Sequence, residues 1–176
     1  MLLAERSTSF TTVGTAAAAM LLVCIAQAAD EPVTRYADAP LFRTLDDAAI
    51  DALRVALQLS GKYEHGGVLL NCRGQFTYTA AVTNNDPHGV RYRIWLPDIC
   101  QVAGIYHTHP VAPFADHFSR ADVASARQRS VRSYIGLVGD HTVLVFDPER
   151  PMHSATRESA LLYRAAAGER IGKAGT

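Results

Sequence analysis

Four strand-like segments follow one another in the middle of this 176-residue chain, with no helical pattern between them. They are rich in β-branched, aromatic and other apolar residues, and the runs Arg73-Gly74 and Asn84-Asn85-Asp86-Pro87 have the composition of turns between strands. Tyr92, Ile94 and Trp95, in the third segment, are expected to pack in the core. The four segments are residues 63–71, 75–82, 91–96 and 102–107.

A helix is expected before these strands. Thr44 and Asp47 have the spacing of a capping box, in which the two side chains satisfy backbone N–H groups at the start of a helix. Apolar residues then recur with helical spacing until Ser60-Gly61 ends the segment. Residues 29–40 contain two prolines and little periodicity, so we expect an exposed lead-in there.

After the four strands, the pattern predicts a helix from Ser119 to about Arg129. Residues 134–138 and 142–146 are strand-like and flank Gly139-Asp140, which predicts a tight hairpin. A last helix is expected over residues 154–167, and residues 171–176 are expected to form a frayed tail. This order of elements predicts one domain over residues 41–170, of the α/β class in its α+β form, with helices flanking a mixed, largely antiparallel sheet.

The first 28 residues have the order typical of a secretory signal peptide. A polar start precedes an apolar run over residues 13–26, and Ala26-Gln27-Ala28 supplies small residues for cleavage. The run is shorter than the roughly 20 apolar residues that a membrane span needs, and an uncleaved N-terminal anchor is the alternative. Cleavage predicts a periplasmic or secreted protein that has no membrane segment once the signal is removed.

The charge balance argues against nucleic-acid binding, and the two cysteines of the mature chain predict a disulfide. The chain has 17 Lys and Arg against 17 Asp and Glu, so it has no basic field for nucleic acid. Arg127, Arg129 and Arg132 are expected to lie on a solvated helix face. Signal cleavage leaves Cys72 and Cys100, which lack the C-x-x-C spacing of zinc ligands. In an oxidising compartment we expect this pair to form a disulfide rather than two free buried thiols.

Two histidines, His107 and His109, end the last of the four strand-like segments. Alternate residues of a strand face the same side, so both imidazoles are expected to converge on one point. Neutral imidazole is the commonest protein ligand for zinc, and Asp122, near the start of the next helix, offers a carboxylate as third ligand. Such a set leaves one tetrahedral position open, as in catalytic sites. Glu64, at the start of the first strand, is the candidate general base.

These residues together resemble the signature of the JAB/MPN superfamily of JAMM-type zinc metalloproteases. The matching positions are Glu64, His107-Thr108-His109-Pro110 and Ser119-Arg120-Ala121-Asp122. The chain looks most like the bacterial JAB-like branch of unknown function that also occurs as a terminal domain of Rhs-type toxins. The resemblance covers roughly residues 41–148 and implies a cytidine-deaminase-like architecture. The nine residues between His109 and Ser119 depart from the family, whose spacing is shorter by two.

The resemblance implies that His107, His109 and Asp122 hold Zn²⁺, and that Glu64 acts as the acid and base. It implies that Ser119 stabilises the oxyanion of a tetrahedral intermediate, although Ser119 and Asp122 also have the spacing of a capping box. The implied reaction is hydrolysis of a peptide or isopeptide bond in a peptide or protein substrate. The alternatives are a JAB-like module that binds without catalysis and a toxin-associated effector that acts on another kind of bond.

Overall fold

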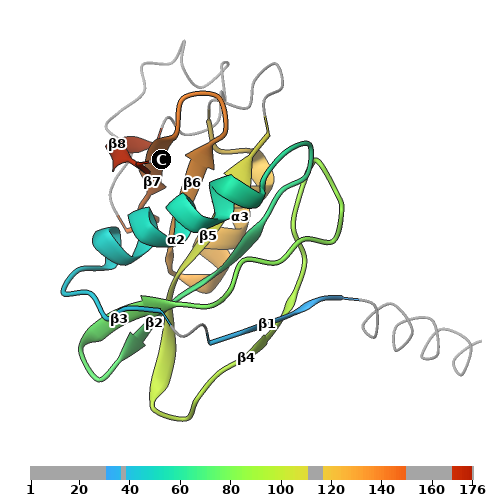
Figure 1. Ribbon diagram of the computed structural model, residues 1–176. Helices are drawn as coiled ribbons and strands as arrows, with labels where there is room; N and C mark the ends of the chain where they lie inside the picture. Colours follow the sequence, from blue (N-terminus) through green and yellow to red (C-terminus); the bar gives the residue numbers. More distant parts are fainter. Residues whose placement is uncertain (1–30, 37–38, 111–116, 150–167, 176) are drawn as a thin grey trace, which may run out of the picture. The chain divides into compact units, whose positions relative to one another are not determined.

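The structure is a computed structural model that describes residues 31–36, 39–110, 117–149 and 168–175 (Figure 1). The signal peptide expected over residues 1–28 and the helix expected over residues 154–167 lie outside these residues. The elements below belong to the unit Pro32–Thr176, which groups separately from Met1–Glu31. Within the described ranges, no helix is long and apolar enough to cross a membrane.

The described residues form a mixed α+β fold, as predicted. Six strands make one sheet in the order β3-β2-β5-β6-β7-β8, and β1 and β4 form a separate parallel pair. In the larger sheet β5 and β6 run parallel, and the other neighbours are antiparallel. The elements are β1 (Val33–Arg35), α2 (Leu45–Leu59), β2 (Gly66–Cys72), β3 (Gln75–Tyr78), β4 (Arg93–Trp95), β5 (Cys100–His109), α3 (Arg120–Arg129), β6 (Arg132–Leu137), β7 (Thr142–Phe146) and β8 (Glu169–Lys173).

The two helices cover opposite faces of the six-stranded sheet (Figure 1). Because side chains alternate along a strand, neighbouring residues of β6 and β7 enter different cores. Tyr134 and Val143 pack with α2, whereas Ile135 and Leu144 pack with Val123 of α3. Each residue of these strands can therefore be assigned to the α2 face or the α3 face of the sheet.

The helix α2 forms where the capping pattern predicts it. Thr44 is its N-cap, and the Thr44 hydroxyl accepts a hydrogen bond from the Asp47 N–H at 3.1 Å. Ser60 is the C-cap, and its N–H donates to the Leu57 carbonyl at 3.3 Å. Small side chains on the buried face let the helix lie close to the sheet, namely Ala48, Ala49, Ala52 and Ala56.

The third predicted strand leaves the main sheet. It is shortened to β4, which pairs with β1 from the predicted lead-in, and the Arg93 N–H donates to the Pro32 carbonyl at 2.9 Å. Thr34 of β1 is fully buried, so the exposed lead-in is a wrong prediction there. Trp95 is 60% exposed and Ile94 is 41% exposed, so the core packing expected for both is also wrong. The strand β4 is held by backbone hydrogen bonds to β1. The sequence could not reveal this partner, because the apolar pattern of three residues is too short to indicate which strand they pair with.

The C-terminal segment is a strand rather than a frayed tail. Residues 169–173 form β8, which pairs with β7 at one edge of the sheet. The Ala174 N–H donates to the His141 carbonyl at 3.0 Å, and the Ala174 side chain is buried. An edge strand with exposed charged side chains such as Arg170 lacks the apolar alternation that identifies an inner strand.

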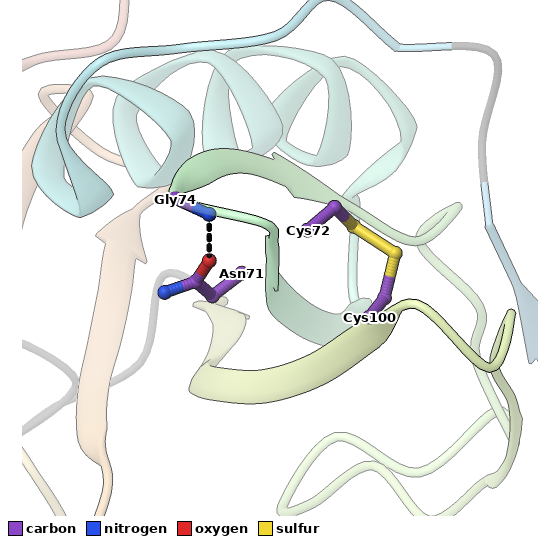
Figure 2. Close-up of a disulfide and its surroundings, with 4 residues drawn as sticks. All are labelled: Asn71, Cys72, Gly74 and Cys100. Carbon is purple, nitrogen blue, oxygen red and sulfur yellow. Dashed lines mark hydrogen bonds between the residues drawn. A yellow bond between two sulfur atoms is a disulfide. The ribbon is translucent and has the colours of Figure 1, made fainter.

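A disulfide joins β2 to β5, as the cysteine pair predicted. Cys72 and Cys100 lie directly opposite each other in the antiparallel register, and their sulfur atoms are bonded (Figure 2). The turn that follows has positive φ angles at Arg73 (56°) and Gly74 (89°), as a two-residue hairpin turn requires. The Asn71 side-chain oxygen accepts the Gly74 N–H at 2.8 Å (Figure 2). The bridge fixes one end of the β2–β5 pair, and the turn joins the same end of β2 to β3.

Removing the disulfide should lower the stability of the fold. The bridged cysteines are 28 residues apart in sequence, and constraining a loop of that size stabilises a protein by about 3–4 kcal/mol. We expect the double variant Cys72→Ala/Cys100→Ala to melt about 10 °C below the oxidised wild type in a thermal unfolding experiment. Identical melting temperatures would contradict a stabilising bridge.

Candidate metal centre

Both histidines of the candidate centre lie at the C-terminal end of β5, on the α3 face of the sheet. Strand alternation separates Ile105, His107 and His109 from Tyr106 and Thr108. Tyr106 packs in the core beneath α2, so the histidines point to the opposite face. His107 is 7% exposed and His109 is 6% exposed, so the two imidazoles are held in a buried environment.

The connection from β5 to β6 carries α3 and brings Asp122 to these histidines. The two strands are parallel, so the chain must cross over one face of the sheet between them. The helix α3 lies in this crossover and packs on that face. Ser119 caps the helix: its hydroxyl accepts the Asp122 N–H at 3.2 Å, and Asp122 Oδ2 accepts the Ser119 N–H at 2.7 Å. The predicted capping box is therefore present, and it holds the Asp122 carboxylate in place.

The donor atoms of the three side chains converge. The Nε2 atoms of His107 and His109 are 3.1 Å apart. Asp122 Oδ1 lies 3.2 Å from His107 Nε2, and Asp122 Oδ2 lies 3.5 Å from His109 Nε2. A four-coordinate ion with bonds of about 2.0–2.1 Å has ligand atoms roughly 3.3–3.4 Å apart. The three residues thus fit a small tetrahedral metal ion and form a group that could hold one.

The charges in this cluster are strongly coupled. Burial disfavours a charged His107, but the adjacent Asp122 carboxylate outweighs burial and raises the pKa of His107. Burial also disfavours a charged Asp122, yet His107 and hydrogen bonds from His107, His109 and Ser119 lower the pKa of Asp122 far below its ordinary value. Asp122 is therefore ionised at neutral pH, as a carboxylate ligand of a cation must be.

Glu64 lies next to this cluster, just before β2 rather than within a strand that starts at residue 63. Its N–H donates to the Asp86 carbonyl at 3.1 Å, and the residue is 7% exposed. Burial raises the pKa of Glu64, and the charges of His107 and His109 oppose that shift. Glu64, His107 and Asp122 line one cavity of about 530 Å³. The cavity therefore places a second carboxylate, suited to proton transfer, beside the donor cluster.

Gly66 allows the Glu64 segment to approach β5 closely. It lies opposite His107 in the β2–β5 register. A Cβ atom at Gly66 would be 2.6 Å from the Tyr106 carbonyl oxygen and 2.9 Å from the His107 Cβ. Because these distances are shorter than van der Waals contact, a larger residue would push the Glu64 segment away from the histidines.

Thr108 ties the same segment to β5 from the α2 face. Its Oγ1 accepts the His65 N–H at 3.0 Å and is 2.5 Å from the Ser60 hydroxyl at the end of α2. The Thr108 N–H also donates to the His65 carbonyl at 2.9 Å. Thr108 therefore anchors His65, the neighbour of Glu64, to β5, the strand that carries both histidines. It anchors the end of α2 to the same strand.

Replacing Thr108 with Val should lower the free energy of unfolding by about 1–3 kcal/mol, because the half-buried His65 N–H loses its side-chain acceptor and the Ser60 hydroxyl loses one partner while keeping its bond to the Ala56 carbonyl. Thr77→Val is the matched control. Thr77 is as deeply buried, but among the described residues its hydroxyl oxygen has no hydrogen-bond partner. Urea unfolding should place the control within about 0.5 kcal/mol of wild type. Equal losses in both variants would argue against the role of Thr108.

The structure brings His107, His109 and Asp122 together, and Glu64 lines the cavity that His107 and Asp122 also line. Ser119 is exposed at the helix cap, where it hydrogen-bonds to Asp122, and it is not one of the described residues that line the cavity.

Arg127 and Arg129 are exposed on α3, as expected, whereas Arg132 lies in β6 and not on a helix. It was not predicted from the sequence that Arg129 also lines the cavity. Its spacing of seven residues from Asp122 along one helix face is the signal that could have identified it.

The chain matches none of the protein-family models with which it was compared, and no curated protein matches it either.

Proposed function

We propose that this protein is a zinc-dependent hydrolase of peptide or isopeptide bonds with a JAB/MPN-like architecture. The observation that carries the proposal is the convergence of three donor atoms beside a cavity that His107 and Asp122 line together with Glu64. His107, His109 and Asp122 would hold Zn²⁺, because two imidazoles and one carboxylate make up the protein ligands of known hydrolytic zinc sites.

Bound zinc supplies Lewis-acid chemistry, polarising a carbonyl and making water acidic near neutral pH. Glu64 accepts a proton from the attacking water as the water oxygen bonds to the carbonyl carbon. Glu64 then delivers that proton to the amine nitrogen as the C–N bond breaks, which leaves a carboxylate and a free amine. The raised pKa of Glu64 favours holding that proton between the two steps. Ser119 donates a hydrogen bond to the developing oxyanion in this scheme.

The order of the elements supports the JAB/MPN architecture. The His107-Thr108-His109 motif ends β5, and Ser119 and Asp122 open the helix that follows. The Cys72–Cys100 disulfide favours an oxidising compartment, so we also propose that the protein acts in the periplasm or outside the cell.

Incubating the purified, zinc-loaded protein with a defined peptide mixture tests this function, with mass spectrometry as the readout. The mixture includes peptides joined through the lysine side chain, so that isopeptide cleavage is also detected. We expect products that differ from the substrate by one added water, loss of cleavage after treatment with a chelator, and recovery on adding zinc. A protein that carries a full equivalent of zinc and cleaves none of these peptides would contradict the proposal.

A further inference from the structure

The cavity that His107 and Asp122 line extends well beyond the candidate metal centre. Its volume of about 530 Å³ lies within the range of about 300–1,000 Å³ that is typical of ligand sites. Much of the wall opposite α3 is apolar and suits an apolar side chain of a ligand. This wall, which we call the apolar wall, consists of Val68, Val90, Tyr92, Ile94, Val102 and Ile105.

The helix α3 forms the other wall of the cavity. Asp122, Ser125 and Arg129 are three and four residues apart, so they lie on one face of the helix, and all three line the cavity. Arg129 Nη1 donates to the Ser125 hydroxyl at 2.7 Å, which draws the guanidinium along this face. Among the described residues that line the cavity, Arg129 is the only lysine or arginine.

The charge of Arg129 reaches across the cavity. Burial raises the pKa of Tyr92 on the apolar wall, and the Arg129 guanidinium opposes that shift. The acidic groups that line the cavity, Glu64 and Asp122, lie at the candidate centre. An anionic group of a ligand is therefore attracted to the Arg129 end and repelled from the carboxylates at the other.

The spacing along α3 sets the length of such a ligand. Seven residues of helix, at about 1.5 Å per residue, place Arg129 roughly 10 Å from Asp122 along the helix axis. An extended peptide covers about 3.3–3.6 Å per residue, so three residues span that distance. The bond to Ser125 occupies one of the five N–H donors of the guanidinium, whose planar fork suits a carboxylate.

We infer that this cavity binds the C-terminal end of a short peptide, with its terminal carboxylate on Arg129 and an apolar side chain on the apolar wall. The carboxylate lies about three residues beyond the bond at the candidate centre. This inference rests on the proposed function, since it takes the cleaved bond to lie at the donor cluster. Arg129 is then a specificity-determining residue that favours peptides with a free C-terminus.

Calorimetric titration of a matched peptide pair tests the inference. The probes are acetyl-Ala-Ala-Leu-Ala-Ala as the free acid and as the C-terminal amide, titrated into zinc-loaded Glu64→Gln protein so that neither is cleaved. We expect the acid to bind about tenfold tighter than the amide, as for one charge-assisted hydrogen-bonded pair. Adding Arg129→Gln should abolish this preference. Adding Arg127→Gln should retain it, because the Arg127 guanidinium lies over the Phe146 ring, 5.8 Å from its centre.

Equal binding of acid and amide, or an acid preference that survives Arg129→Gln at unchanged zinc content, would overturn the inference. The second result would place the carboxylate on the metal instead. Failure of the proposed function is separate, because the preference is measured by binding alone. A protein that cleaves peptides without an acid preference refutes only the role of Arg129, whereas an Arg129-dependent preference in a protein that cleaves nothing refutes only the hydrolase.

Discussion

Replacing Glu64 with Gln should reduce peptide cleavage at least about 100-fold while leaving zinc bound, because general acid–base catalysis contributes about 10²–10⁴-fold. The amide of glutamine has nearly the same shape as the carboxylate, but it cannot accept the proton of the attacking water. Glu64 is not one of the three residues that form the donor group. Cleavage rates by chromatography and zinc content by elemental analysis, on the same preparations, check both parts of the prediction.

Glu149→Gln is the matched control for this experiment. Glu149 is an exposed carboxylate in the turn after β7, and its loss removes the same charge outside the cavity. We expect the control to cleave at the wild-type rate. A Glu64→Gln protein that keeps cleavage within a few-fold of wild type, or one that loses zinc together with activity, would contradict the role of Glu64 in proton transfer.

Zinc should stabilise the folded protein, and His109→Ala should abolish the effect. The three donor atoms converge only in the folded chain, so zinc binds the native state in preference to the unfolded state. At a free zinc concentration of 100 times Kd, the expected stabilisation is about 2.7 kcal/mol. That free energy corresponds to a rise in melting temperature of roughly 5–10 °C for a domain of this size. Thermal unfolding with zinc and with a chelator measures the difference.

His88→Ala is the control for the stability measurement. His88 is an exposed histidine that lines the cavity outside the donor cluster. We expect this variant to show the full zinc-dependent rise. Equal rises in wild type and in His109→Ala would show that zinc binds elsewhere on the chain.

The capped helices and the faces of the strands follow from local rules. Thr44 and Ser119 have the capping spacing that starts α2 and α3, and both helices begin there. The pleat of a strand puts residues two apart on one face, so His107 and His109 could be paired from the sequence. Asp122 lies in the first turn of α3 on that face. Its closeness to the histidines could not be predicted, because it depends on the crossover from β5 to β6, which no local sequence pattern describes.

Contacts that depend on register could not be predicted. The β2–β5 register shifts between Leu69 and Leu70, where β5 contains one extra residue. This irregularity lets Val102 and Ile105 share a wall of the cavity, although strict alternation would put them on opposite faces. The approach of Glu64 to the histidines depends on the same register. The strands β1 and β8 pair through their backbones, so side-chain patterns gave no signal for them.

Elemental analysis of the purified protein tests the central claim most directly, with wild type, His107→Ala and Asp122→Asn compared after identical reconstitution. The account predicts about one zinc per chain in wild type and less than about a tenth of that in either variant, since each removes one of three protein ligands. Circular dichroism spectra like that of wild type would show that the variants remain folded. A wild-type protein that holds no zinc after reconstitution, or variants that retain the wild-type amount, would contradict the metal centre and the hydrolase built on it.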